Sequence, residues 1–425
     1  MSAGVSTASR HPRQHPPRYL SGATLAAAVA VSAGFTTFIL LRGLDLNPYD
    51  FMDLAVYREG VQAWWQSTDM YGTLPPTPNG YVLPFIYPPF AALVLSPLAA
   101  MPWTAAWLCA GVVSLASLGV VVWIVSLRVW PEGGHRGAVL SCTVIVPLSL
   151  FLEPVQETLW YGQVNLLLMA MVAADCLVEQ PRWPRGLLIG LAAAVKLTPA
   201  GFVLMLLLRK DFRASAVAVG SALLATAIGF AVNWHGSLRF FFDGSTGLGQ
   251  AANTPYATNQ TIKAALERMN LPIALQNGLW LGLAAIVVAL GVIGIRRAVR
   301  AGRPALAMAI TAALLLTCAP TAWGHHWVYV VPALLVLLGH GIRRTHSGWL
   351  LAFAAMAAAF VLAPFYWCPV LTSPVDHRMH WSTAQHFYGN TYVILTVLSL
   401  LAYALPAVLA WRSDRASGHD TTATL

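Results

Sequence analysis

The chain has 425 residues, of which 57% are hydrophobic and only 10% are charged, and its formal net charge is +9. Such a composition excludes a disordered chain and a soluble globular enzyme, and it is typical of a polytopic helical membrane protein. The positive charge is interpreted here as a signal of membrane topology and not as a nucleic-acid footprint.

The N-terminal residues predict a tail followed by a first membrane helix. Residues 1–19 carry Arg10, Arg13 and Arg18 among prolines, and a basic flank of this kind favours a disordered tail on the cytoplasmic side. The apolar run 20–41 is long enough to cross a bilayer and has no small-residue cleavage site behind it. We therefore expect a retained membrane helix and not a signal peptide.

Further apolar runs predict roughly eleven to thirteen membrane crossings within one domain over residues 20–411. Two of these runs are irregular. The run 88–100 is short and bounded by proline, which favours a half helix or a re-entrant segment. The run 186–208 contains Lys196-Leu-Thr-Pro199 and is expected to divide into two short helices.

Charge and polarity distribute unequally between the two sides of this topology. Most of the 25 Lys and Arg residues fall in segments that alternation places inside, including a second tail at 412–425. The predicted outer loops are 42–86, 153–163, 233–276, 320–327 and 364–388. They hold most of the polar and aromatic residues. A transporter needs polar groups along a path through the bilayer, so this grouping favours an enzyme at the outer face of the plasma membrane.

Asp53 is the first candidate for chemistry, because it follows the first membrane helix in a predicted polar loop rich in Tyr, Trp and Pro. A carboxylate beside the bilayer, in a loop of this kind, is more easily explained by chemistry on a membrane substrate than by folding. The alternative is an ordinary solvated acid or a helix N-cap. If a cation lies close by, Asp53 is expected to remain ionised at neutral pH.

Lys196 is the one cation predicted inside an apolar helix pair, where a charge costs a few kcal/mol unless it has a partner. A substrate phosphate is one explanation, and snorkelling to the interface is the other. His325 and His326 are predicted phosphate or acceptor contacts, with an interfacial pair as the alternative. Neighbours on a helix point about 100° apart, so at most one of them faces a given site directly.

Two further polar groups lie in the outer segments. The first comprises Glu153, Glu157, Gln163 and Asn165. These residues either contact an acceptor glycan or hydrogen-bond between helices. The second comprises Asn259, Gln260, Thr261 and Arg268. Its members bind sugar hydroxyls, or Thr261 or Asn259 simply caps a short amphipathic helix. No metal site is predicted, because the first loop has no Asp-x-Asp pair and adjacent histidines rarely chelate one ion.

Several short motifs, in this order along the chain, together resemble glycosyltransferase family 87. They are Asp53-x-x-x-Tyr57, Phe85-Ile-Tyr-Pro-Pro-Phe90, Gly162-Gln-Val-Asn165, Lys196-Leu-Thr-Pro199, Asn259-Gln-Thr-Ile262 and Trp323-Gly-His-His326. The resemblance spans about residues 20–411 and implies the all-α GT-C membrane fold. Members of the family transfer sugars from polyprenyl phosphates, and the chain most resembles those that add α-1,2-linked mannose to phosphatidylinositol mannosides.

The resemblance implies an inverting transfer from polyprenol-phosphate-mannose to a phosphatidylinositol mannoside, with Asp53 as the base and with neither cofactor nor metal. It implies that Lys196, His325 and His326 bind the donor phosphate. The implied acceptor or sugar contacts are Tyr57, Arg58, Gln163, Asn165, Asn259, Gln260 and Arg268.

Two alternatives stay open. One is an arabinofuranosyltransferase that uses decaprenyl-phosphoarabinose with the same base and phosphate contacts. The other is a lipid or solute transporter, which the sequence disfavours because Asp175 is the only acid placed firmly inside a helix.

Overall fold

The computed structural model describes residues 22–45, 50–243, 255–344, 347–369 and 380–417. Within these ranges the chain forms helices and loops without a strand, and an isolated bridge pairs Asn259 with Trp323. The predicted all-α fold is confirmed. The predicted tail 1–19, residues 418–425 of the second tail, and parts of the predicted outer loops 233–276 and 364–388 lie outside the described residues.

Five helical segments of the described chain are long and apolar enough to cross a membrane. They are Gly22–Gly43 in α1, Trp103–Val129 (α4), Phe212–Val232 (α10), Ile273–Arg300 (α14) and Gly324–Arg343, which joins η4 to α16. The pair Pro131–Ser149 and Glu153–Tyr161, bent by 76°, is a sixth candidate. The protein is therefore a multi-pass membrane protein.

Shorter apolar helices fill the remaining predicted runs. They are Pro89–Ala100 (α3), Asn165–Leu177 (α7), Thr198–Leu208 (η2 with α9), Pro304–Cys318 (α15), Ser347–Leu362 (α17) and Thr391–Pro406 in α19. Whether each of them crosses the bilayer is not decided by length, so the expected eleven to thirteen crossings stay a prediction. The remaining helices used below are α2 (Met52–Trp65), α5 (Gly134–Ser149), α6 (Glu153–Tyr161), α8 (Leu187–Val195) and α13 (Ile262–Glu267).

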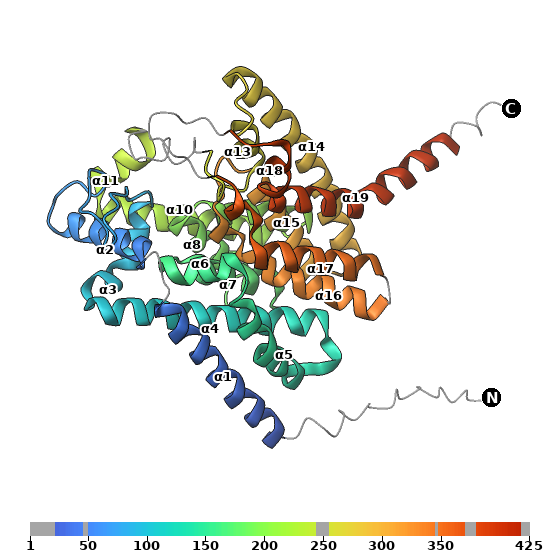
Figure 1. Ribbon diagram of the computed structural model, residues 1–425, viewed down its shortest axis with the longest axis horizontal. Helices are drawn as coiled ribbons and strands as arrows, with labels where there is room; N and C mark the ends of the chain where they lie inside the picture. The colour runs from blue at the N-terminus through green and yellow to red at the C-terminus, as the bar shows by residue number, and fades with distance from the viewer. Residues whose placement is uncertain (1–21, 46–49, 244–254, 345–346, 370–379, 418–425) are drawn as a thin grey trace, which may run out of the picture.

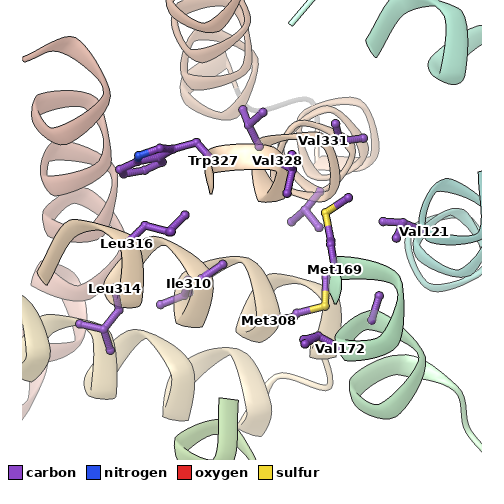
Figure 2. Close-up of a cluster of buried hydrophobic side chains, with 14 of the residues drawn as sticks. Val121, Met169, Val172, Met308, Ile310, Leu314, Leu316, Trp327, Val328 and Val331 are labelled. Atoms are coloured by element: carbon purple, nitrogen blue, oxygen red, sulfur yellow. The ribbon is translucent and has the colours of Figure 1, made fainter. Parts of the chain in front are cut away.

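The helices pack into one body from which α1 and the end of α19 project (Figure 1). Helix α4 packs on α5 and α7, α8 packs on α10, and α14 packs on α15 and α19. Figure 2 shows the apolar centre, where side chains of α7 and α15 face those of η4 and α16. Met169 and Met308 are fully buried there and Trp327 nearly so. This packing fixes the start of the η4–α16 segment, which carries both histidines.

The run 186–208 divides as predicted, because α8 ends where Lys196 adopts an extended conformation. The run 88–100 forms the 12-residue helix α3, and its half-helix or re-entrant character stays a prediction. The surroundings of Asp53 differ from the prediction. Asp53 lies in the first turn of α2 and not in a loop. It is not the N-cap either, because that position belongs to Phe51.

Exposed ion pairs join segments that the charge pattern placed on the same side. Arg128 at the end of α4 pairs with Glu179, and Arg343 at the end of α16 pairs with Glu132. Arg239 pairs with Asp69 between two predicted outer segments. These contacts agree with the predicted grouping of the loops.

Candidate active site

The start of α2 positions Asp53. Phe51 has a left-handed backbone (φ 54°), its N–H donates to the Trp160 carbonyl at 3.0 Å, and its ring stacks on Trp107 at 5.3 Å. The first turn of α2 is thereby held against the end of α6. A carboxylate in the first turn also lies close to the positive end of the helix dipole.

Gly162 brings the polar segment after α6 against α2. It ends α6 with φ 70°, and a Cβ at this position would lie 2.7 Å from the Leu54 Cβ. Both the left-handed conformation and the close approach require glycine. The next side chain, Gln163, donates from Nε2 to Asp53 Oδ2 at 2.7 Å. Its Oε1 accepts from the Tyr57 hydroxyl at 2.7 Å, so the amide is fixed from both ends.

Lys196 lies on the other side of the same segment. Its Nζ donates to Asn165 Oδ1 at 2.9 Å and lies 2.9 Å from His326 Nε2. An ammonium only donates, so this imidazole nitrogen accepts and the His326 ring is neutral. Within the described chain, no carboxylate oxygen lies within 4.0 Å of Nζ, since none of the ion pairs includes Lys196. A cavity of about 30 Å³ adjoins Lys196 and His326 and is bordered by Thr198.

The two histidines divide between two environments. Their rings lie 4.7 Å apart at 86°, as expected for neighbours that cannot face the same direction. His326 meets Lys196, whereas His325 is buried with Nδ1 3.6 Å from Glu157 Oε2. The His325 carbonyl accepts from Asn165 Nδ2 at 2.9 Å, which fixes the turn to α7.

Burial dominates the electrostatics of Asp53. It raises the pKa of the half-buried carboxyl above its ordinary value, although His325, the Gln163 hydrogen bond and Lys196 act in the opposite direction. The cation Lys196 therefore acts on Asp53, but its effect does not outweigh desolvation. A carboxylate with a raised pKa is a stronger base than a free aspartate, which suits proton abstraction.

The structure gives three predicted sugar contacts a different role. Asn259, Gln260 and Arg268 are fully buried. Gln260 donates to the Gly389 carbonyl at 2.8 Å, and Arg268 donates to the Tyr256 carbonyl at 2.7 Å. Direct sugar contact is not open to these buried side chains here. They hold the segment before α13 in place, a role that differs from the helix cap offered as the alternative to sugar binding.

The neighbours of these residues confirm that alternative. Thr261 caps α13 by accepting from the Ala264 N–H at 3.0 Å, and Asn259 accepts from the Ala322 N–H at 3.0 Å. The Asn259–Trp323 bridge then ties this segment to the turn that carries the histidines. The motif thus supports the site through the backbone.

Arg58 is also a structural contact. Its guanidinium donates to the Met101 carbonyl at 2.7 Å and to the Leu98 carbonyl, and it lies over the Trp103 ring. These bonds connect α2 to the end of α3, because the last carbonyls of a helix lack intrahelical partners. The predicted acceptor contact does not fit a guanidinium engaged in this way.

Sequence reasoning missed the roles of three residues. The Tyr87 hydroxyl donates to Gln163 Oε1 at 3.3 Å. The Tyr87 ring faces Lys196 Nζ, which lies 5.7 Å from the ring centroid. Glu157 faces His325, and Tyr366 donates to Glu157. The spacing of Glu153, Glu157 and Tyr161 was the available signal, because residues four apart share a helix face.

A multi-pass helical body in which a carboxylate, an amine and two histidines gather at helix ends is compatible with a membrane enzyme. The family model of glycosyltransferase family 87 matches residues 85–320. The chain belongs to this family, and it is a membrane glycosyltransferase whose all-α fold agrees with the GT-C class. Gln163, Asn165 and Lys196 lie inside the matched range.

Curated relatives cover most of the chain. A polyprenol-phosphate-mannose-dependent alpha-(1-2)-phosphatidylinositol mannoside mannosyltransferase of Mycobacterium tuberculosis is 34% identical over 84% of each chain. The corresponding pentamannoside mannosyltransferase of the same species is 29% identical over 94% of this chain and 90% of its own. An alpha-(1->3)-arabinofuranosyltransferase of Corynebacterium glutamicum is 24% identical over 75% of this chain and 74% of its own. No solved structure matches significantly.

Proposed function

We propose that the protein is an inverting α-1,2-mannosyltransferase that moves mannose from polyprenol-phosphate-mannose to a phosphatidylinositol mannoside at the outer leaflet. The names of the mannosyltransferase relatives support the donor and the acceptor class. One observation carries the proposal for the site. The segment from Gly162 to Asn165 holds the base Asp53 through Gln163 and the cation Lys196 through Asn165.

The proposed reaction is a single displacement. Asp53 takes the proton of an acceptor mannose hydroxyl, and the hydroxyl oxygen forms a bond to the anomeric carbon of the donor mannose. The bond from that carbon to the phosphate oxygen breaks, and its electron pair leaves with the polyprenyl phosphate. Attack from the opposite face converts a β-linked donor into an α-linked product.

Lys196, His326 and Asn165 are the proposed contacts of the donor phosphate. Lys196 now meets only neutral groups at hydrogen-bond distance, so its charge is available for an anion. The cavity that adjoins both Lys196 and His326 supports this assignment. Amine and imidazole would then stabilise the charge that develops on the leaving phosphate.

We propose that Tyr57 and Gln163 orient the base Asp53. Of these two residues, only Gln163 contacts the sugar, on the side that faces Asp53. Two hydrogen bonds of the Gln163 amide are made to residues of α2, and its Oε1 also accepts from the Tyr87 hydroxyl at 3.3 Å, so rotating the amide would break all three together. Replacement of Tyr57 by Phe therefore loosens the base without removing it.

The proposed reaction uses no metal. Among the described residues, no three His, Cys, Asp or Glu side chains gather where they could hold an ion. We expect transfer to be unchanged by a chelator, and stimulation by added Mg²⁺ or Mn²⁺ would contradict this.

The donor sugar is tested by direct transfer. Purified protein in detergent is offered polyprenyl-phosphomannose or decaprenyl-phosphoarabinose with phosphatidylinositol mannosides, alongside Asp53→Asn. Mannose transfer that disappears in the variant supports the proposal. Arabinose transfer would keep the mechanism and replace the sugar, as the arabinofuranosyltransferase relative allows. Transfer from neither donor would return the transporter to consideration.

The side of the membrane is tested separately. Gln66, after α2, and Lys210, after α9, are both exposed, and the predicted topology places them on opposite sides. Gln66→Cys should react with a membrane-impermeant thiol reagent on intact cells, whereas Lys210→Cys should react only after permeabilisation. The reverse pattern would place the site inside.

A further inference from the structure

A second and larger cavity lies next to the candidate site. Its volume is about 100 Å³, on the same scale that gives about 30 Å³ for the cavity beside Lys196 and His326. Its walls come from η4, α15, α16, α17 and α19, and none of the described side chains that line it is charged. Protein interiors keep few voids larger than a water molecule, and apolar cavities take up apolar guests. The size and lining therefore indicate an apolar ligand.

Small side chains help to create this space. Ala309 and Ala313 lie one turn apart on the same face of α15, and Ala333 lines the cavity from α16. Among the larger lining residues, Leu316 on α15 lies across from Trp327 on η4 (Figure 2). A bulkier residue in place of one of the alanines would occupy part of the cavity, so these positions control how much room a ligand has.

The two cavities meet at two side chains. Leu316 and Tyr329 line both the larger cavity and the smaller cavity that adjoins Lys196. Tyr329 is held in this position by its ring, which stacks on the Phe202 ring of η2 with 5.3 Å between the centroids. A ligand whose charged end contacts Lys196 therefore needs to pass only Leu316 and Tyr329 to place an apolar part in the larger cavity.

The larger cavity is elongated along α15 and leads away from Lys196. Its lining on this helix extends from Leu316 back to Leu306, which is about 15 Å of α-helix at a rise of 1.5 Å per residue. Trp349 lines the far end, where its ring packs on His340 near the end of α16, with ring centroids 5.1 Å apart. A long, uncharged cavity of this kind fits an extended hydrocarbon chain better than a compact ligand.

The order of chemical groups favours the donor over the other lipid of the proposed reaction. In a polyprenyl phosphate, the hydrocarbon begins directly at the phosphate oxygen, so a phosphate at Lys196 has its chain within reach of Leu316 and Tyr329. In a phosphatidylinositol mannoside, glycerol separates the acyl chains from the phosphate, and inositol and sugars separate that phosphate from the hydroxyl that reacts. The polar cavity followed at once by an apolar one matches the donor.

We propose that the larger cavity binds the part of the donor's isoprenoid chain that lies next to the phosphate, and that Ala309, Ala313 and Ala333 determine which lipid chains fit. This inference rests on the proposed function, because that function places the donor phosphate at Lys196 and His326. A chain held in the cavity fixes the phosphate from its hydrocarbon side. Binding energy from this remote part of the donor then helps to orient the sugar for attack.

Photocrosslinking tests the location of the chain directly. Purified protein in detergent receives polyprenyl-phosphomannose that carries a diazirine on the second isoprene unit from the phosphate. After irradiation, the label should map to peptides of α15 and α16, and excess unlabelled polyprenyl phosphate should suppress it. A phosphatidylinositol mannoside with a diazirine on an acyl chain serves as the parallel probe. Labelling of these peptides by the acyl probe and not by the donor probe would overturn the inference, as would labelling by neither.

The matched variants Ala309→Phe and Ala354→Phe test the cavity by kinetics. Ala309 lines the cavity, whereas Ala354 on α17 is exposed and does not line it. With a long-chain donor, Ala309→Phe should raise the donor KM by about tenfold, because the new ring competes with the chain for space, and it should leave the acceptor KM unchanged. Ala354→Phe should match wild type. A normal donor KM in Ala309→Phe would overturn the inference.

A donor with a single isoprene unit separates a blocked cavity from a damaged fold. Its chain is too short to reach Ala309, which lies about 10 Å along α15 from Leu316. Ala309→Phe should therefore use the short donor as well as wild type does. If the variant fails with this donor too, its fold is damaged, and the crosslinks to the wild-type protein decide the question. If wild type transfers no mannose from either donor, the proposed function fails; if it does and the donor probe labels other helices, only the inference fails.

Discussion

The two sets of charged residues in this molecule are arranged in opposite ways. In the ion pairs Arg128–Glu179 and Arg343–Glu132, whose carboxylates are exposed, each cation contacts a carboxylate directly. At the candidate site, amides stand between the charges. Gln163 contacts Asp53 and Asn165 contacts Lys196, and no ion pair of the described chain includes either charged residue.

The separation of Lys196 and Asp53 by amides indicates why buried charged residues are retained at the candidate site. A cation and an anion held apart by neutral amides stabilise the fold less than a direct pair would, and they pay a desolvation penalty. That arrangement is useful only if something charged or ionisable enters between them. In the proposed reaction, a lipid phosphate would satisfy Lys196 and an acceptor hydroxyl would satisfy Asp53.

Asp53→Asn is expected to have the largest effect. The amide oxygen still accepts from Gln163, so the fold is retained, but the group can no longer take a proton. Transfer should fall by about a thousandfold, within the range that general bases contribute. The measurement is initial-rate transfer from polyprenyl-phosphomannose.

Asp69→Asn is the matched control, because this carboxylate lies in the same outer region but pairs with Arg239. It should retain near-normal activity. Substantial residual transfer by Asp53→Asn, or an equal loss in Asp69→Asn, would break the distinction between the two sets of charges.

Lys196→Met should have the next largest effect. Loss of a charged hydrogen-bond donor to phosphate costs about 1.5–3 kcal/mol, which corresponds to roughly ten- to a hundredfold in kcat/KM. The loss should appear in kcat/KM for the donor and not in kcat/KM for the acceptor. Arg239→Ala, which removes an exposed cation from the same region, should leave both dependences unchanged. Equal loss toward donor and acceptor would indicate a structural role for Lys196.

The dependence of kcat/KM on pH sharpens the assignment of the base. Burial raises the pKa of Asp53, and only its ionised form accepts a proton. Activity should therefore fall as pH falls through that raised pKa, with a midpoint above the value of about 4 typical of free aspartate. Since Lys196 lowers the pKa of Asp53, Lys196→Met should move the acid limb of the kcat/KM profile to still higher pH. A limb that does not move would contradict the coupling between base and cation.

The same shift has a consequence for stability. A carboxyl whose pKa is raised by folding binds its proton more tightly in the folded state, so its contribution to stability is present at low pH and is lost as pH rises through the folded pKa. Thermal unfolding of Asp53→Asn should therefore depend less on pH in this range than that of wild type.

The sequence predicted the membrane fold and offered Asp53 and Lys196 as site candidates because both leave local signals. Apolar runs of sufficient length mark the helices, and Asp53 and Lys196 stand out as charges in apolar surroundings. Their partners could not be predicted. The contact between Gln163 and Asp53 joins residues 110 positions apart, and nothing in one sequence pairs them.

The errors have a shared cause. Arg58, Gln260 and Arg268 are polar residues in outer segments, and sequence alone does not distinguish a polar group that meets substrate from one that satisfies buried carbonyls. Asp53 was placed in a loop because the left-handed Phe51, which lets α2 begin directly before it, has no sequence signature comparable to glycine.

Disruption of the Arg343–Glu132 pair should have the smallest effect. Both side chains are exposed, so Arg343→Ala should change the free energy of unfolding by less than about 1 kcal/mol, and less still at high salt. Transfer activity should also be unchanged. The test is demanding, because α16 runs from the histidine turn to this pair, and a displaced α16 would move His325 and His326. A loss of activity in Arg343→Ala would therefore show that the exposed charges and the site are mechanically coupled, whereas unchanged activity confines catalysis to the buried set.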